Sequence, residues 1–481
     1  MTTTTPTEPV EPTATTAPPA DEAPRRVVFA VPGPVTSRFV GWLAALTLLG
    51  FLVRVLNVLW WRPTTDAPGY HGYRLWGDAF YYHWQANALA KGAWFVDPVL
   101  WFLDGSQRPS AGHPPLYPTY LALWSSIGLD GVTAHRLASG VLGTATIVVV
   151  ALLARRLAGN AAGLIAAAIV ALYPQMWIND GMILSETMAI FMTAVALTAA
   201  YVFWRTPSMR NACLLGLACG AAALSRTELA LMIPLVIVPL CCFLRELDWG
   251  RRIKLIVVAG LMSAVIVGPW IVFNYTRFEE TTTMTSGTGS ALSAASCDEV
   301  WYGKLIGYYA NCFQGPWPDA SLDESQRDLV PREQAIEYTK DHISRLPLVV
   351  AARVGRLWDV FKPGQTTMLD WWIEGRGRVP SWIGLFAYYA LWPFAIYGLV
   401  VMRRRRVPII PLLAIAAIAT FAAAITFGVT RYRAPAEVPL VLAASIGAAA
   451  VWKNWRARRA QTPGPAQTDG YPRDGDVRQS A

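Results

Sequence analysis

The sequence predicts an all-α protein that crosses a membrane many times. Of its 481 residues, 54% are hydrophobic and only 15% are charged, and the mean hydropathy is +0.34. A soluble domain carries about 25% charged residues, so this balance indicates that lipid surrounds much of the chain. Apolar runs also recur almost from end to end. These observations exclude an ordinary cytosolic enzyme, a secreted disulfide scaffold and a disordered chain.

Ten stretches approach or exceed the roughly 20 helical residues that cross about 30 Å of hydrocarbon. They are residues 39–61, 132–153, 160–178, 182–204, 210–224, 228–245, 252–275, 381–402, 407–427 and 434–452. The apolar stretch 115–127 is too short to span comfortably, so we expect an interfacial helix there. The polar, Pro-containing ends of the chain cannot bury enough surface to fold and are expected to be disordered.

Charge patterning tests this assignment and orients the chain. With 115–127 at the interface, basic residues gather on one side of the membrane, which the positive-inside rule identifies as cytoplasmic. These residues are Arg25, Arg26, Arg155, Arg156, Arg205, Arg210, the run 245–254, Arg403 to Arg406 and the tail from Lys453. The net charge of +9 therefore reflects cytoplasmic loops, and no nucleic-acid partner is expected.

The resulting topology divides the chain into five parts with both termini inside. The division is a cytoplasmic tail 1–37, a membrane module 38–275 with an outer loop 62–131, an extracytoplasmic segment 276–380, C-terminal transmembrane helices 381–455 and a cytoplasmic tail 456–481. Of the six cysteines, only Cys297 and Cys312 lie in an external segment. An oxidising exterior allows these two to form a disulfide, although their spacing alone does not prove the pairing.

Polar groups near hydrocarbon are costly, and here most of them fall at the outer face. The acidic and basic examples are Arg54, Asp78, Arg136, Glu186, Arg226, Glu228, Arg277, Arg431 and Arg433. Independent spans thus deliver acids and bases to one level of the membrane. This pattern predicts an anion-binding, acid–base site at the outer face.

The segment that begins at Asp78 carries the strongest site signal. On a helix, Asp78, Tyr81 and Tyr82 share one face, and the preceding Gly77 allows the chain to turn sharply. The carboxylate would then be exposed at the helix N-terminus. Two interpretations stay open: a catalytic or substrate-binding carboxylate, or a simple N-cap.

A metal or a nucleotide has little support in the sequence. His71, His83 and His113 with Asp78 are conceivable zinc ligands, but no HxxH or HxxxH spacing accompanies them. We expect no cofactor to be required. A Walker A sequence and a G-x-G-x-x-G motif after a strand are both absent, which gives no support to a nucleotide-driven pump.

Taken in order, the motifs resemble the GT-C integral-membrane glycosyltransferases. The similarity is to glycosyltransferase family 39, the protein O-mannosyltransferase and aminoarabinose-transferase group. The matching pieces are the helix from Asp78, the HPPLYP stretch from His113, Arg136 with its span, LSE at Glu186, SRTE around Arg226, GPWIVFNYTRF and RYRAPAEVP. The resemblance covers most of residues 38–455 and implies a GT-C-like bundle of about ten transmembrane helices with interfacial helices in the first outer loop.

The resemblance also implies a reaction and roles for residues. A sugar would move with inversion from a polyprenyl-phosphate carrier to a glycolipid, polysaccharide or protein acceptor at the outer face of the cytoplasmic membrane. Asp78 would accept the proton of the acceptor hydroxyl. Candidates for holding the phosphate are Arg136, Arg226, Arg277, Arg431 and Arg433, and candidates for contacting substrate are Tyr81, Tyr82, His113 and Glu186.

One departure and one alternative accompany this interpretation. Several relatives carry two adjacent acids at the catalytic position, whereas Ala79 follows Asp78 here, which weakens the case for a metal and for protein O-mannosylation. The alternative function is a flippase or transporter of polyprenyl-linked lipids. A transporter should place polar residues near the membrane centre of several spans, but here they cluster at one face.

Overall fold

The computed structural model describes residues 35–461 apart from 63–74, 76, 316–318 and 320, and these described residues form helices and loops without a β-strand. The one departure from helix and loop is an isolated antiparallel bridge between Val96 and Pro109. The predicted all-α class is therefore confirmed. His71, offered as a metal ligand, lies outside the described residues.

Among the helices that the structure describes, six are long and apolar enough to cross a membrane. They are α1 (Ser37–Leu56) continued by η1 (Asn57–Trp61), α6 (Val132–Ala158), α9 (Glu186–Arg205), α12 (Trp249–Tyr275), α18 (Arg378–Arg404), and α20 (Ala434–Gln461) preceded by η6 (Thr430–Arg433). A seventh candidate is bent by 73° between α7 (Asn160–Leu172) and the pair α8 (Pro174–Trp177) and η2 (Ile178–Gly181).

Shorter apolar helices occupy the other three predicted spans. They are α10 (Met209–Ala223), the broken run η3 (Thr227–Leu231), η4 (Ile233–Ile237) and α11 (Val238–Cys242), and α19 (Ile410–Ile425). Every predicted span therefore has a helix, while the number that crosses the bilayer stays a prediction. Helix α20 continues to Gln461, so the stretch from residue 456, which we expected to be disordered, begins as helix.

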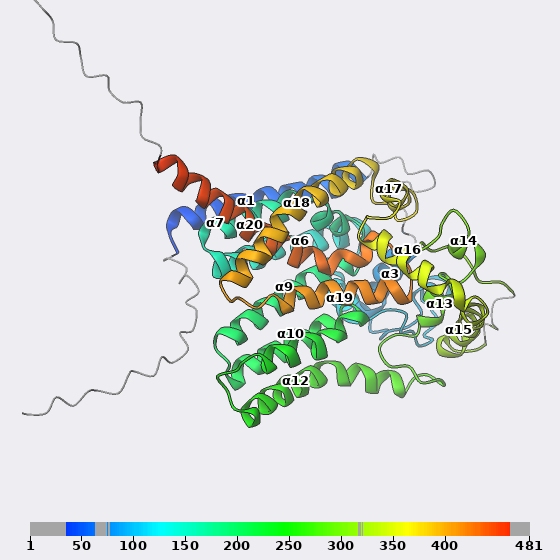
Figure 1. The fold of residues 1–481 in the computed structure, drawn as a ribbon. Coiled ribbons are helices and arrows are strands. Elements are labelled where there is room, and N and C mark those ends of the chain that lie inside the picture. Colours follow the sequence, from blue (N-terminus) through cyan, green and yellow to red (C-terminus); the bar gives the residue numbers. More distant parts are fainter. Residues whose placement is uncertain (1–34, 63–74, 76, 316–318, 320, 462–481) are drawn as a thin grey trace, which may run out of the picture.

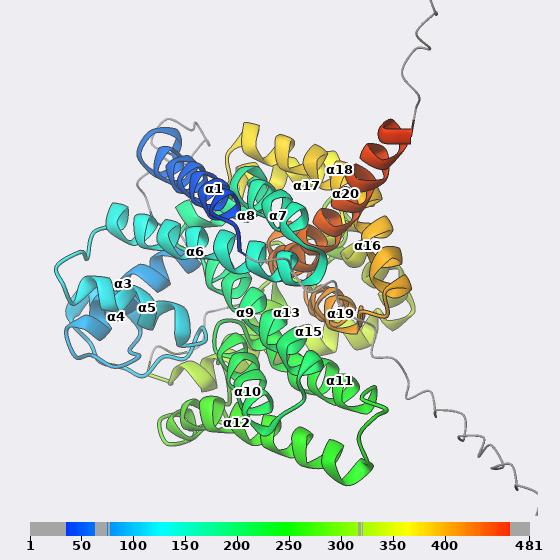
Figure 2. The same cartoon turned by 90° about the vertical axis from the view of Figure 1, so that its left-hand side faces the viewer.

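The membrane helices form one bundle, which Figure 2 shows approximately end-on, with α9 near the middle and α1 and α12 towards opposite edges. In the most apolar stretch of α9, 61% of the residues are buried, against 17% in α1 and 22% in α12. Two glycines let α18 and α20 approach closely: a Cβ added at Gly398 would lie 1.9 Å from the Ala443 carbonyl, and one at Gly447 would lie 2.0 Å from that of Phe394. Small residues at such crossings are typical of membrane helix packing.

A layer of short helices gathers at one end of the bundle (Figure 1). The segment 62–131, predicted to be an outer loop, supplies α3 (Asp78–Ala90), α4 (Pro98–Asp104) and α5 (Leu116–Ser125). The later segment supplies α13 (Thr288–Ser293), α14 (Asp298–Trp301), α15 (Glu324–Asp341), η5 (Ile343–Arg345), α16 (Leu346–Leu357) and α17 (Pro363–Trp372). At about 1.5 Å per residue, α5 is too short to cross the bilayer, as expected.

The Cys297–Cys312 disulfide is present in this layer, as the sequence suggested. It lies beside the fully buried Trp301, whose indole N–H donates to the carbonyl oxygen of Ala295 at 2.8 Å. The disulfide and this small apolar cluster stabilise the segment that covers the end of the bundle.

Candidate active site

A cavity of about 690 Å³ lies where the outer layer meets the membrane bundle. Its lining comes from distant parts of the chain: Asp78 opens α3, Arg136 lies in α6, Glu324 begins α15, Glu374 follows α17, and Arg431 precedes α20. Both long segments between the predicted spans, 62–131 and 276–380, therefore contribute to the cavity, together with membrane helices. The predicted convergence of acids and bases at one end of the bundle is observed.

The start of α3 presents Asp78 to the cavity. Gly77 has φ = 51°, a left-handed conformation that glycine adopts without a Cβ penalty, and α3 begins at the next residue. The Asp78 side chain remains 32% exposed, so a ligand in the cavity can reach it. Tyr81 also lines the cavity, whereas Tyr82 is buried beneath it and packs against the ring of His113 at 4.8 Å.

Arg431 connects three carboxylates. Its Nε donates to Glu186 at 2.8 Å, its Nη1 donates to Glu374 at 3.0 Å, and its Nη2 donates to Oδ2 of Asp78. Tyr309 then donates its hydroxyl to the other oxygen of Glu374 at 2.6 Å. A planar guanidinium suits this task because its donors point in fixed directions. The result is that Asp78 is held in a defined orientation from η6, more than three hundred residues away in the chain.

The charge state of Asp78 follows from its surroundings. Burial opposes ionisation, but Arg431 and His113 outweigh it and hold the pKa of the Asp78 carboxyl well below its usual range. The His113 Nε2 atom lies 3.4 Å from Oδ1, the oxygen that Arg431 leaves free. Asp78 is therefore a carboxylate at neutral pH, with one oxygen committed to Arg431 and the other directed towards His113.

Glu186 and Arg226 lie behind the cavity and outside its lining. Glu186 is fully buried and accepts hydrogen bonds from Arg431 and, at 2.6 Å, from Arg226. Arg226 also pairs with Glu228 and lies over the ring of Tyr432. Both residues were offered as substrate or phosphate contacts. Their burial instead makes them the support that fixes Arg431.

Two further arginines line the cavity with Asp78. These are Arg136, a predicted phosphate ligand, and Arg62, which the sequence argument did not single out. The Nη1 atom of Arg62 donates to the Gly375 carbonyl at 3.1 Å. Burial, and after it the positive charge of Arg136, lowers the pKa of Arg62 to about 9. Two neighbouring positive charges repel each other, so a bound anion between them would stabilise the charged form of both arginines.

Arg277 and Arg433, the other two proposed phosphate ligands, lie outside the cavity lining. Arg277 donates to the carbonyl oxygens of Phe95 at 2.8 Å and Ser110 at 3.2 Å, which fastens the end of α12 to the outer loop. Arg433 is 1% exposed and pairs with Asp359 and Glu437, each at 2.7 Å. These contacts give both arginines structural roles, and the prediction that they bind the phosphate is therefore wrong.

Sequence reasoning missed two acids of the cavity. Glu374 is bound by Arg431, and Glu324 accepts the backbone N–H of Ala111 at 2.8 Å, with burial raising its pKa. Both lie in the 276–380 segment, where no motif marked them. Of the aromatic residues in this segment, Tyr309 lines the cavity, while Trp301 and Tyr308 are fully buried.

Among the residues that the structure describes, no group of three or more His, Cys, Asp and Glu side chains is placed to hold a metal ion. His83 and His135 contact each other through their Nδ1 atoms at 3.0 Å, away from the cavity lining. The three acids that do converge share the cation Arg431.

Comparisons with known proteins agree with this architecture. A model of the family described as "Dolichyl-phosphate-mannose-protein mannosyltransferase" matches residues 112–273, about a third of the chain. The archaeal oligosaccharyltransferase AglB from Archaeoglobus fulgidus, solved with an inhibitory peptide and a dolichol-phosphate, superposes with a TM-score of 0.50 at 13% identity. The match covers 88% of this chain and 52% of AglB, so the chain spans about half the length of that structure. No curated protein sequence matches.

Two other solved structures superpose with lower TM-scores. The protein O-mannosyltransferase Pmt1-Pmt2 complex of S. cerevisiae gives a TM-score of 0.38 at 17% identity, covering 54% of this chain and 37% of that one. ArnT from Cupriavidus metallidurans gives 0.38 at 14% identity, covering 89% and 82%. With the bundle, the outer helical layer and the superposition on AglB, the chain has the fold of the GT-C membrane glycosyltransferases.

Proposed function

We propose that this protein is an inverting glycosyltransferase that moves a sugar from a polyprenyl-phosphate carrier to an acceptor. The acceptor is a glycolipid, a polysaccharide or a protein of the cell envelope. The observation that carries the proposal is the cavity that holds an exposed, ionised Asp78 together with the arginine pair Arg62 and Arg136. A glycosyl transfer from a lipid phosphate needs both a proton acceptor and a cationic site for the leaving group.

The chemistry assigns one step to each group. The acceptor oxygen attacks the anomeric carbon while its proton moves to Oδ1 of Asp78. The bond between the anomeric carbon and the phosphate oxygen breaks, and the electron pair stays on the phosphate. Arg62 and Arg136 then stabilise the developing negative charge. A single displacement inverts the configuration at the anomeric carbon.

Arg431, Glu186 and Glu374 act as positioning residues in this scheme. Arg431 keeps Oδ2 of Asp78 occupied, so Oδ1 is the oxygen left to receive the proton. Holding a base within hydrogen-bond reach of its proton is a prerequisite of general base catalysis. Glu186 and Glu374 in turn fix the plane of the Arg431 guanidinium.

The position of the cavity supports transfer at the outer face of a cytoplasmic membrane. The cavity lies at the end of the bundle opposite the loops that carry the arginine-rich segments, such as Arg403 to Arg406 after α18. The positive-inside rule places those segments in the cytoplasm. The substrate sugar would therefore be presented by a carrier lipid in the outer leaflet.

The test is a donor assay with the full-length protein in proteoliposomes. Radiolabelled polyprenyl-phosphate sugars are supplied one at a time with a membrane-lipid extract as acceptor, and nucleotide sugars serve as the control donors. Carrier-dependent transfer of one sugar supports the proposal. Binding of carrier-linked sugars without transfer, accompanied by movement of label across the bilayer, would favour the transporter instead.

A further inference from the structure

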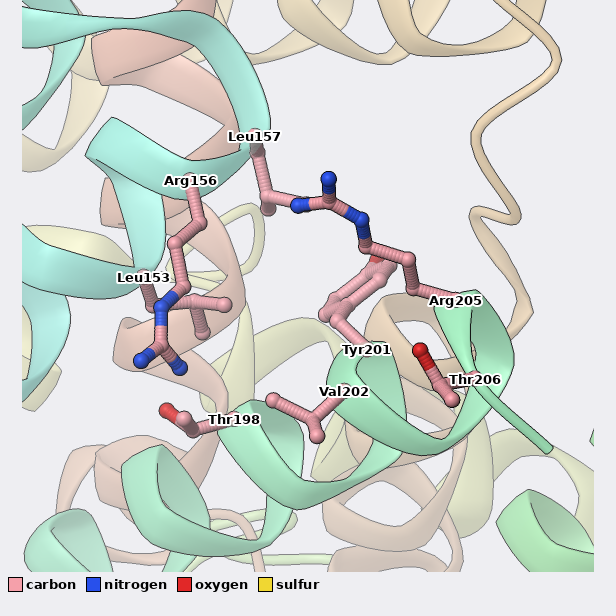
Figure 3. A pocket seen from close by; sticks show the side chains of 8 residues that line it. All are labelled: Leu153, Arg156, Leu157, Thr198, Tyr201, Val202, Arg205 and Thr206. Atoms are coloured by element: carbon pink, nitrogen blue, oxygen red, sulfur yellow. The ribbon is translucent and has the colours of Figure 1, made fainter. Parts of the chain in front are cut away.

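A second pocket, of about 420 Å³, lies at the other end of the bundle between α6 and α9. Figure 3 shows the guanidinium groups of Arg156 and Arg205 reaching into the space between the two helices from opposite sides. Arg156 lies twenty residues after the cavity residue Arg136 on the same helix. At about 1.5 Å per residue this is roughly 30 Å, the thickness of the hydrocarbon core. The pocket therefore lies at the opposite membrane interface.

Arg156 and Arg205 are both exposed, and they are the two basic residues that line the pocket. Within the described part of the chain, neither Arg156 nor Arg205 forms a hydrogen bond or an ion pair, and no acidic side chain lines the pocket. Arg155, their neighbour, donates from Nε to Asn160 at 2.7 Å and lies over the Phe39 ring at 5.2 Å. Two positive charges thus face a shared space without a protein counter-ion.

Most of the remaining lining is apolar, with Thr206 as a further polar residue at the edge of the pocket. Leu153, Leu157 and Val202 supply hydrocarbon surface beside the two guanidinium groups. The Thr198 hydroxyl donates to the Ala194 carbonyl at 2.8 Å. The pocket consequently offers forked cationic donors next to an apolar wall.

We propose that this pocket binds the phosphate headgroup of an anionic lipid in the leaflet opposite the catalytic cavity. Guanidinium groups bind phosphate oxygens through paired, charge-assisted hydrogen bonds. Basic pockets between membrane helices at an interface are suited to such headgroups, and the apolar wall would contact the start of the acyl chains. The proposal is independent of the transfer reaction, because no residue of the pocket belongs to the catalytic cavity.

The test is thermal unfolding of the full-length protein in a zwitterionic detergent, titrated with dioctanoyl phosphatidic acid. We expect a saturable rise of the unfolding midpoint, because a ligand that binds only the folded protein stabilises it. The variant carrying Arg156→Gln and Arg205→Gln should bind at least about tenfold more weakly. Arg210→Gln removes an exposed arginine at the start of α10, outside the pocket, and should leave the titration unchanged.

Three results would overturn the proposal. They are the absence of a saturable shift, an equal shift in the double variant, and an equal shift with inorganic phosphate or with dioctanoyl phosphatidylcholine. The double variant Arg156→Lys and Arg205→Lys serves if the glutamine variant fails to fold. Lysine keeps both charges but loses the fork, so binding should fall between wild type and complete loss; affinity equal to wild type would contradict recognition by the guanidinium pairs.

Discussion

Buried arginines have two different surroundings in this protein. Arg54 and Arg433 lie inside the bundle and are neutralised by protein carboxylates, Arg54 by Asp180 at 2.6 Å and Arg433 by Asp359 and Glu437 at 2.7 Å. Arg62 and Arg136 instead line the cavity side by side. A charge near hydrocarbon is costly in both regions, and the difference lies in what compensates it. Inside the bundle protein carboxylates compensate the charge. In the cavity the protein also contacts the arginines, as Arg62 does with the Gly375 carbonyl, and we propose that the substrate phosphate adds the compensating negative charge.

The largest expected effect is a loss of stability when an arginine paired inside the bundle is removed. Arg433→Ala would leave Asp359 and Glu437 buried without a cation, which should lower the free energy of unfolding by about 3–5 kcal/mol. Thermal unfolding in detergent measures the loss, with the exposed Arg404→Ala as the matched control. Transfer per folded molecule should persist. A normal unfolding midpoint with lost transfer would assign Arg433 to the substrate instead.

The next effect concerns the cavity pair. Arg136→Gln removes a cation from the proposed leaving-group site, and charged hydrogen bonds contribute about 1.5–3 kcal/mol. We therefore expect the affinity for the polyprenyl-phosphate donor to fall by roughly 10- to 150-fold. A binding titration with non-transferable polyprenyl phosphate measures it. Unchanged donor affinity would remove Arg136 from the phosphate site and weaken the contrast with Arg433.

A smaller effect should appear in the pH dependence. Arg431 holds the pKa of Asp78 low, so the carboxylate is ionised and active at any pH above that depressed value. In Arg431→Gln the pKa of Asp78 should rise, because the adjacent guanidinium that favours the ionised carboxylate is gone. The acid limb of kcat/KM should then move to higher pH. An acid limb at the same pH in both proteins would show that another group controls it.

The smallest expected effect is that of chelation. The three converging acids are bound to Arg431, so we expect EDTA to leave the transfer rate of the purified enzyme unchanged. Activity that falls with EDTA and returns with a divalent ion would show that the site holds a metal. That result would mean that a metal ion, and not Arg431 alone, neutralises the three carboxylates.

The fold was predictable because it rests on local signals. Apolar length identifies the spans, and helices occur at every predicted span. The start of α3 was predictable for the same reason, since Gly77 and Asp78 determine it locally. The orientation inferred from the bias of Arg and Lys stays a prediction. The depth of a polar residue was less predictable. Glu186 is fully buried and bound by Arg431, although its place at the start of a span suggested access to substrate.

The missed parts of the site depend on contacts between distant segments. Glu374 reaches Arg431 through the folding of the 276–380 segment over the bundle, and no local pattern encodes that approach. Arg62 has only its place after Trp60 and Trp61 as a signal, which also fits an interfacial anchor. Arg62 and Arg433 show that the sequence can identify arginines whose burial near hydrocarbon is energetically unfavourable. The residues that pair with them can be identified only from the fold.

Asp78 is proposed to accept the proton of the acceptor hydroxyl, and the rate of a single turnover tests this role. Single-turnover transfer from the identified donor is compared in wild type, Asp78→Asn and the exposed outer-loop control Asp104→Asn. General base catalysis contributes about 10²- to 10⁴-fold, so Asp78→Asn should lose at least about 100-fold in rate with near-normal donor affinity, and the control should match wild type. Transfer by Asp78→Asn within a few fold of wild type would contradict the account.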